Sequence, residues 1–455
     1  MKQIACVVAG ALLLTGCSLA PTYQRPQSVT AQNWASVQEG QASAAQIPWK
    51  SFFHSKELQA VVETALANNR DLKTAVLNVR KTQELYRIER ADLLPQLNGS
   101  GSGEYRRDFH DNSTESYNVG LAMASYEVDL FGRVQNLSDA ALATYLATDE
   151  ARKSVTIALI AQAASSWLQL TSDQQTLALT RESLASREET YAIVKKSYDN
   201  GVATRQDLSQ ARMALESARV NTIRYARIVQ LDKNALVSIL GTRDLTGIPL
   251  SAELKNTSVM EEIPVGLPSE VLLNRPDILQ AEFKLKAAGA NIGAARAAFY
   301  PRIALTGSLG YSSTDLGNLI SSDNAGIGIG PSISIPIFNA GRNKALLKAA
   351  EIDQEMAVVA YEKTLQDAFK EVADALAARE TLGRQLSAQG KLVEASLETF
   401  DLAMKRYNEG LDSFLNVLDA QRSLFDAQTA EIDLQRQELA NRVTLYKVLG
   451  GGLTP

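Results

Sequence analysis

The sequence repeats itself once over most of its length. Residues 70–105 realign with 276–311 at an offset of 206 residues, and residues 198–241 realign with 407–450 at an offset of 209. An offset held within three residues over such a span indicates a duplication. We therefore expect two copies of one unit, at 60–241 and 268–450, joined by a linker at 242–267 that contains proline and glycine and followed by a short tail at 451–455.

Proline is absent between Pro95 and Pro249 and again between Pro336 and Pro455. Because proline breaks helix interiors, gaps this long permit very long helices. A helix over 132–200 would reach roughly 100 Å at 1.5 Å per residue. Apolar side chains recur every seven residues in both gaps, which is typical of helices packed along a shared seam. In the first gap these are Leu170, Leu177, Leu184, Tyr191 and Tyr198. In the second gap two heptad positions are apolar, one with Val393, Phe400 and Tyr407 and the other with Leu397, Met404 and Leu411.

Each copy has the same predicted order: a helix, two strands, then a long helical stretch. The strands are expected at about 96–107 and 117–130 in the first copy and at about 302–312 and 325–338 in the second. Isoleucine alternates with glycine or serine after Ala325, which predicts one apolar face and one small or polar face. Such a sheet could pack on a helix, or its strands could belong to an outer-membrane barrel.

Strand length favours the barrel, because about ten alternating residues are what a membrane strand requires. No later stretch approaches the roughly 20 apolar residues of a membrane helix, so a spanning role would fall to strands. Four strands cannot close a barrel alone, since single-chain barrels begin at about 8. The chain would have to oligomerise, and three copies would supply about twelve strands. A free-standing coiled-coil rod accounts for the helices equally well but leaves the strands unexplained.

The long helices are predicted to end at hairpin tips. Gly201 and Gly410 each follow a polar triplet, and new helices are expected to begin near Arg205 and Phe414. A helix, a glycine, a short turn and a second helix form such a tip. The two copies therefore carry equivalent tips near 200–205 and 409–414, far along the chain from their strands.

The amino terminus is predicted to be a lipoprotein signal peptide over 1–16. A basic start and a short apolar run lead to Leu-Thr-Gly-Cys at 14–17, which resembles a bacterial lipobox. Cys17 would then become the lipidated first residue of the mature chain, and Cys6 would leave with the signal. An ordinary signal peptide with an incidental cysteine is the alternative. Ser18 stands where an inner-membrane retention signal usually has aspartate, so the resemblance favours the outer membrane.

Composition argues against several other classes of protein. A formal charge of -5 and a pI near 5.4 disfavour a nucleic-acid binder. Two histidines and two cysteines leave little for metal or thiol chemistry, and His54 and His110 belong to no recognisable zinc motif. The alternating glycines at 326–330 lie inside an expected strand and open no helix, unlike a dinucleotide-binding loop. We predict no enzyme, catalytic residue, metal site or cofactor.

Several segments together resemble the outer-membrane factor family, the TolC- and OprM-like channels of tripartite efflux pumps. The lipidated OprM-like branch is the more similar. The matching segments cover essentially the whole mature chain in the order of the family. They are 49–53, Ser-Tyr-Glu-Val-Asp-Leu-Phe-Gly-Arg at 125–133, Gly-Leu-Pro-Ser at 266–269, Arg-Pro-Asp-Ile at 275–278, Ile-Gly-Ala-Ala-Arg at 292–296, Tyr-Pro at 300–301, Asp-Ala-Gln-Arg-Ser-Leu at 419–424 and Leu-Tyr-Lys-Val-Leu-Gly at 445–450.

The resemblance implies a mixed fold, in which a homotrimer forms a twelve-stranded barrel in outer-membrane lipid and an α-helical barrel in the periplasm. A belt would be built from the segment at 17–59, the linker and the carboxyl end. The channel would be a passive exit for drugs and other toxic compounds, fed by an inner-membrane RND-type transporter through a periplasmic adaptor protein. Export of proteins or of metal ions remains an alternative within the channel class, and a structural coiled-coil lipoprotein remains one outside it.

The resemblance also assigns two sets of residues. The periplasmic gate falls on Tyr407, Leu415, Asp419 and Arg422, and the resemblance leaves open whether Asp207 joins it. On spacing alone, an aspartate and an arginine three residues apart form an ordinary surface pair. The adaptor would dock on the tips, at Asn200, Gly201, Val202 and Thr204 and at Glu409, Gly410, Leu411 and Ser413.

Overall fold

The computed structural model describes residues 18–27, 44–110, 112–248, 250, 253–265 and 272–453. The chain divides into two compact units. The first comprises 1–28, 77–151 and 277–364, and the second comprises 29–76, 152–276 and 365–455. Each unit therefore takes residues from both copies of the repeat, because helices α4 (Arg70–Ala91), α5 (Arg133–Asp199) and α9 (Arg342–Asn408) pass from one unit into the other.

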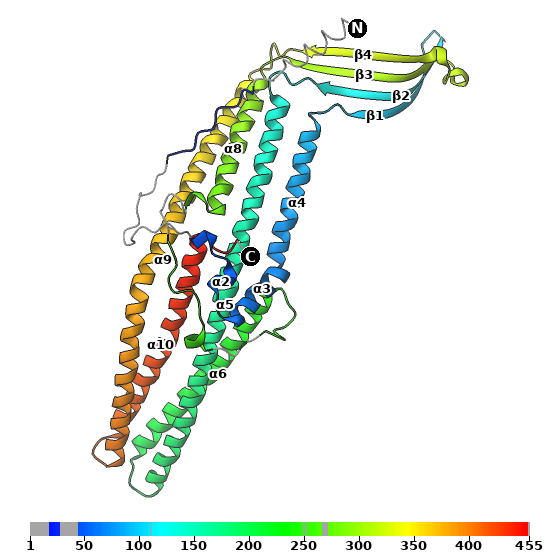
Figure 1. The fold of residues 1–455 in the computed structure, drawn as a ribbon. Coiled ribbons are helices and arrows are strands. Elements are labelled where there is room, and N and C mark those ends of the chain that lie inside the picture. Colours follow the sequence, from blue (N-terminus) through cyan, green and yellow to red (C-terminus); the bar gives the residue numbers. More distant parts are fainter. Residues whose placement is uncertain are drawn as a thin grey trace. The chain divides into compact units, whose positions relative to one another are not determined.

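The first unit contains one antiparallel sheet in the order β1-β2-β3-β4 (Figure 1). Its strands are β1 (Leu97–Arg107), β2 (Ser113–Glu127), β3 (Arg302–Ser313) and β4 (Ala325–Ser334). β2 begins earlier than the sequence indicated, because Ser113 pairs with Arg107 across the first hairpin. β4 ends earlier, at the pair formed by Ser334 and Arg302, just before Pro336, which has no N–H to continue the ladder.

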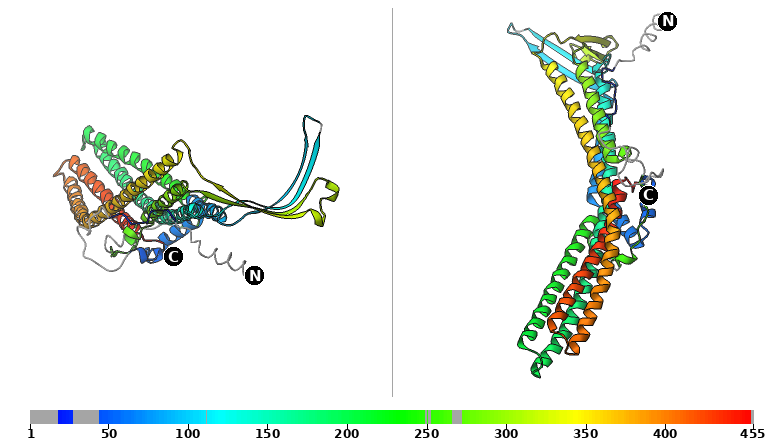
Figure 2. Two further views of the ribbon diagram at one scale, coloured as in Figure 1. Left: turned by 90° about the horizontal axis from the view of Figure 1, so that it is seen from above. Right: turned by 90° about the vertical axis from the view of Figure 1, so that its left-hand side faces the viewer.

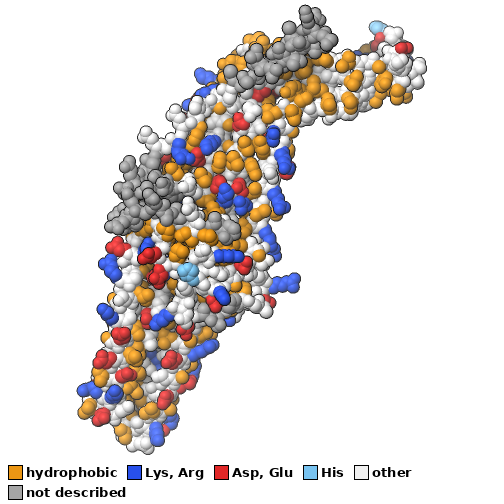
Figure 3. All heavy atoms as spheres, in the orientation of Figure 1, with side chains coloured by type: hydrophobic (Ala, Val, Ile, Leu, Met, Phe, Trp, Pro, Cys, Tyr) orange, Lys and Arg blue, Asp and Glu red, His pale blue; other side chains and the backbone are white. Residues whose placement is uncertain are grey.

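The strand register puts apolar side chains on one face of the sheet and small ones on the other. Leu121 pairs with Leu309, which pairs in turn with Ile327, and the next row joins Ala122, Ser308 and Gly328. The apolar face is open, since Ile327 is 76% exposed and hydrophobic side chains run along the strands in Figure 3. Within the described part of the chain this face is not packed on a helix, which removes that alternative for the sheet.

The helices of the first unit are α8 (Pro276–Ala297) and the neighbouring parts of α4, α5 and α9. Glu127 ties the end of β2 to the start of α5 and of β3. Arg133 donates two hydrogen bonds to its carboxylate, at 2.8 and 2.7 Å, and Arg302 Nη2 donates a third to Oε2 at 2.6 Å. Asp129 caps α5 by accepting hydrogen bonds from the backbone N–H groups of Arg133 and Gln135.

The second unit consists of the remaining parts of the long helices with α2 (Trp49–Phe52), α3 (Lys56–Asn68), α6 (Arg205–Leu240) and α10 (Phe414–Val448). Phe52 stacks on Tyr446 with ring centroids 4.0 Å apart, and the Tyr446 hydroxyl donates to the carbonyl oxygen of Ile47 at 2.6 Å. Phe53 forms a backbone bridge with Val259. These contacts bring the amino-terminal segment, the linker and the carboxyl-terminal helix together.

Three backbone turns are conserved between the two copies of the repeat. In each copy, glycines with positive φ, which other residues rarely adopt, lie after the second strand, at the hairpin tip and at the end of the last tip helix. Gly132, Gly201 and Gly241 have φ of 71°, 77° and 65°, and Gly341, Gly410 and Gly450, each 209 residues later, have φ of 83°, 73° and 82°. Helices α5 and α9 are each 67 residues long. The duplication therefore extends to the backbone conformation.

Figure 2 shows from two further sides that the strands form one continuous sheet and that the α5–α6 and α9–α10 hairpins run side by side. No helix among the described residues has both the length and the hydropathy needed to cross a bilayer.

Candidate functional site

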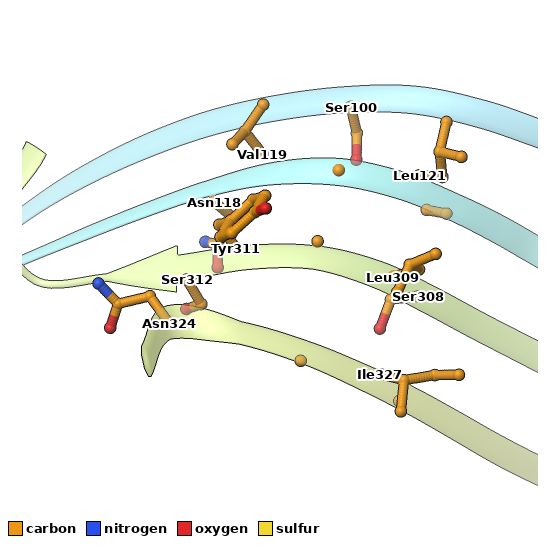
Figure 4. Close-up of a pocket in the computed structure, with 15 residues that line it drawn as sticks. Ser100, Asn118, Val119, Leu121, Ser308, Leu309, Tyr311, Ser312, Asn324 and Ile327 are labelled. Atoms are coloured by element: carbon orange, nitrogen blue, oxygen red, sulfur yellow. The ribbon is translucent and has the colours of Figure 1, made fainter. Parts of the chain in front are cut away.

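The small-residue face of the sheet contains a hollow of about 300 Å³. In Figure 4, Ser100 and Ser308 point their hydroxyl groups to one side of the sheet, whereas Val119 and Leu121 point to the other. The alternation expected from sequence thus separates a surface that can hydrogen-bond to water from an apolar one. This is the arrangement of strands that meet water on one face and hydrocarbon on the other.

Two glycines make this face tight at the junction of the two copies. Gly120 pairs with Gly310 across β2 and β3. A Cβ atom on Gly120 would lie 2.4 Å from the carbonyl oxygen of Leu309 and 2.6 Å from the Cα atom of Gly310. No side chain fits there, so the backbones of β2 and β3 approach each other more closely at this pair than any residue larger than glycine would allow.

The first hairpin tip, between α5 and α6, is closed by a reciprocal cap. The Thr204 hydroxyl accepts a hydrogen bond from the Asp207 backbone N–H at 3.1 Å, and the Asp207 carboxylate accepts one from the Thr204 N–H at 2.9 Å. The carboxylate of Asp207 is therefore engaged in capping α6. Of the other residues expected at this tip, Asn200 and Gly201 form the turn and Val202 is 82% exposed.

The second tip, between α9 and α10, differs chemically from the first. Ser413, equivalent to Thr204, makes no side-chain cap, and Asn416 replaces Asp207. Arg406 instead forms an ion pair with Asp412, and the hydrogen bond that its guanidinium donates lowers the pKa of that carboxyl. The expected docking residues Glu409, Gly410 and Leu411 lie in this exposed turn.

An apolar cluster lies next to the tips and joins the two hairpins. Its buried residues are Val194, Ala211, Phe414 and Val417, from α5, α6 and α10. Tyr407 packs against them, with its ring centroid 5.3 Å from that of Phe414. Burial raises the pKa of Tyr407, and the nearby charge of Asp207 raises it further. Tyr407 is thus part of the packing of this tip.

The other three residues of the expected gate share one exposed face of α10. Leu415, Asp419 and Arg422 are spaced by four and three residues, which places them on one side of a helix. Arg422 Nη2 donates to Asp419 Oδ1 at 3.0 Å, and both side chains are more than half exposed. The pair is therefore open to solvent on the surface of α10.

Two features of the second unit were not identified from the sequence. A groove of about 480 Å³ between α9 and α10 borders Asp419 and is lined mainly by small residues, of which Ala395, Thr399 and Ala403 recur every four positions. The second feature is a carboxyl pair formed by Asp173 of α5 and Asp232 of α6. Burial and the neighbouring Asp173 raise the pKa of Asp232 to about 7. The small-residue spacing could have indicated the groove, whereas no sequence pattern links the two aspartates.

The remaining candidate positions have ordinary surroundings. His54 Nδ1 lies 3.3 Å from the Ser258 hydroxyl, and the His110 N–H donates to Asp108 in the turn between β1 and β2. Among the described residues, no three His, Cys, Asp or Glu side chains gather closely enough to hold a metal ion. Cys17, the expected lipidation site, lies outside the described residues.

Comparison with known proteins gives a consistent result. A model of the family described as outer membrane efflux protein matches twice, at residues 61–242 and 267–451. The probable efflux pump outer membrane protein TtgC of Pseudomonas putida is 44% identical over 464 aligned residues, which cover 99% of this chain and 96% of that protein. The outer membrane protein OprJ of Pseudomonas aeruginosa is 43% identical, with 97% and 94% covered.

A solved structure extends the likeness to three dimensions. The open state of the Neisseria gonorrhoeae MtrE outer membrane channel is 39% identical and superposes with a TM-score of 0.90, covering 96% of this chain and 99% of that one. The fold described above, with four antiparallel strands and long helices in each chain, is therefore that of an outer-membrane channel. On its sequence, its repeat and its fold, the chain belongs to the outer membrane efflux protein family.

Proposed function

We propose that this outer-membrane efflux protein works as a passive exit duct built from three identical chains. The observation that carries the proposal is the sheet, in which β1 and β4 are edges within the chain and the apolar face is open. Unpaired strand edges are not tolerated in lipid. Joining β4 of one chain to β1 of the next closes the ring, and three chains of four strands give a twelve-stranded barrel.

In this assembly the face that carries Leu121, Leu309 and Ile327 meets lipid, and the face with Ser100 and Ser308 lines the water-filled pore. In the middle of the sheet the pore face carries small, uncharged residues such as Ser100, Gly120 and Ser308, which would not select a solute by charge or bulk. The charged pair of Glu104 and Arg106 on the same face lies toward the β1–β2 turn. Substrate choice then rests with the inner-membrane transporter. The exported compounds are drugs, solvents and other toxic molecules, since relatives are named for toluene, solvent and antibiotic efflux.

The remaining parts have separate roles. Cys17 carries acyl chains that anchor the mature amino terminus in the outer membrane. The two tips dock a periplasmic adaptor, and their different capping chemistry gives that partner two kinds of site. Leu415, Asp419 and Arg422 form the gate with Tyr407, because threefold symmetry would repeat an exposed charged pair around the pore.

Planar-bilayer recordings of the purified protein test the proposal. A trimeric duct gives discrete single-channel openings, whereas a coiled-coil lipoprotein gives none, and absence of conductance would refute the duct. A deletion strain tested against antibiotics, dyes, bile salts, solvents and metal ions then defines the cargo. Sensitivity to metal ions alone would favour metal efflux, and loss of a secreted protein would favour protein export.

A further inference from the structure

Residues 18–27 form an extended strap along the first unit, on α8 and the start of α5. The Ser18 hydroxyl donates to Asn136 Oδ1 at 2.8 Å. Arg296 Nη1 donates to the carbonyl oxygen of Leu19 at 3.1 Å. Gly293 makes room both for Asn136 and for the strap, because a Cβ atom at that position would lie 2.6 Å from Asn136 Nδ2 and 2.8 Å from the backbone nitrogen of Ala20. This end of the strap is therefore seated in a site shaped to receive it.

A second point of attachment follows a few residues later. Glu282 of α8 is 4% exposed, and its two carboxylate oxygens are held by different cations. Arg25 of the strap lies 2.7 Å from Oε2, and Lys286 of α8 lies 2.8 Å from Oε1. The Lys286 ammonium also lies 4.9 Å from the centroid of the Tyr23 ring. Burial raises the pKa of Tyr23 to about 12, and Glu282 adds to the effect.

The strap also meets polar groups that are buried in the first unit. Asn136 is 1% exposed, and its Nδ2 has no hydrogen-bond partner among the described residues. The fully buried Tyr361 of α9 lies within electrostatic range of both Arg25 and Glu282. The strap is held by hydrogen bonds at Ser18 and Leu19 and by an ion pair at Arg25, which a segment resting loosely on an apolar surface would lack. The pattern is that of an intramolecular binding site for the mature amino terminus.

We propose that residues 18–25 are a clamp that fixes the lipid-bearing end of the mature chain to α8 and α5. A free segment of about ten residues could carry its acyl chains over roughly 35 Å. The clamp removes that freedom, so the anchor enters the membrane at one place relative to the sheet. The inference rests on the proposed lipidation of Cys17 for what the clamp carries. The clamp itself rests on the contacts of Glu282 and Asn136.

Cleavage by chymotrypsin after Tyr23 measures opening of the clamp. The protease needs the segment in an extended, released form, so the rate of cleavage follows the population of the open state. Mature wild-type protein is compared with Glu282→Gln and Arg25→Gln, and the fragment that ends at Tyr23 is followed by mass spectrometry. Glu84→Gln, which removes one carboxylate of the exposed pair with Arg87 in the same unit, serves as the control.

We expect both clamp variants to be cut about tenfold faster than wild type, since a charge-assisted hydrogen bond is lost, and the control to match wild type. Arg25→Gln keeps the test valid if Glu282→Gln fails to fold, because the Arg25 side chain is 44% exposed. Equal cleavage of wild type and Arg25→Gln would overturn the clamp. Conductance and palmitate labelling of the same samples report separately on the duct and on lipidation, so the proposals can fail independently.

Discussion

At the scale of single residues, the ion pair between Asp419 and Arg422 does not by itself identify a role in gating. Both side chains are more than half exposed, so their ion pair contributes at most about 1 kcal/mol to stability. A gate role would therefore appear in permeation and leave folding almost unchanged.

We predict that Asp419→Ala with Arg422→Ala raises the conductance of the closed state without changing thermal stability. In the proposed gate these residues would form a charged ring, which the double variant would lose while leaving the remaining packing of α10 untouched. Single-channel recording measures the effect. The control is Asp433→Ala with Arg436→Ala, an ion pair of the same spacing on the same helix. Unchanged closed-state conductance would remove these two residues from the gate.

Asp232 gives a pH prediction. Its pKa rises from 3.8 to about 7 on folding, so the folded state binds more protons between these values, and stability falls as pH rises through this range. Asp232→Asn avoids this loss. The gain in melting temperature over wild type should therefore be larger at pH 8 than at pH 4, as circular dichroism in detergent can measure. The second copy already carries Asn441 at the equivalent position, and an equal gain at both pH values would contradict the assignment.

Only some of these residue contacts could be predicted from the sequence. The common face of Leu415, Asp419 and Arg422 follows from their spacing on a helix. The packing of Tyr407 against Phe414 depends on which helices meet, and spacing does not encode it. The cap made by Asp207 was missed, although Thr-x-x-Asp at 204–207 has the spacing of a capping box. The Asp173–Asp232 pair joins residues far apart in the chain, so only tertiary structure could identify it.

At the scale of elements, the duplication supplies natural controls. We predict that Thr204→Ala weakens the start of α6 by about 1 kcal/mol, because the reciprocal cap with Asp207 is lost. Ser413→Ala at the equivalent position should have almost no effect, since Ser413 makes no side-chain cap. Hydrogen exchange of the first turns of α6 and α10 distinguishes the two tips, and equal changes would argue against the asymmetry.

The close approach of β2 and β3 gives a second prediction for an element. Gly120→Ala should destabilise the sheet by about 1–3 kcal/mol, because its Cβ atom would collide with backbone atoms that cannot turn aside. Gly326→Ala on the same face should be tolerated, since a Cβ atom there meets nothing within 4 Å. The yield of heat-resistant oligomer in outer-membrane fractions compares the variants. Equal yields would show that the strands can separate at Gly120 without cost.

The existence of these elements followed from sequence more readily than their ends. Alternation over 325–334 and proline-free stretches with heptads are strong local signals, and they gave the strands and the long helices. The end of β4 was placed four residues late because Ile335 and Ile337 continue the alternation after the ladder has stopped. The strand ends where its hydrogen bonds to β3 end, although the apolar alternation continues beyond that point.

At the scale of the whole molecule, we predict that the mature protein in detergent has three times the mass of one chain. The two open edges of the sheet favour closure by further copies, and three copies of four strands would give the twelve strands of the proposed barrel. Light scattering with correction for bound detergent measures the mass. A stable monomer that retains its strands would contradict closure between chains.

The two copies are also joined unequally to their long helices. In the first copy, Glu127 forms ion pairs with Arg133 and Arg302 where β2 leads into α5. Pro336, which cannot form such pairs, occupies the equivalent position in the second copy. Arg342, the counterpart of Arg133, makes no ion pair within the described part of the chain. Because these ion pairs have no counterpart at the second joint among the described residues, we expect the second joint to bend more readily than the first.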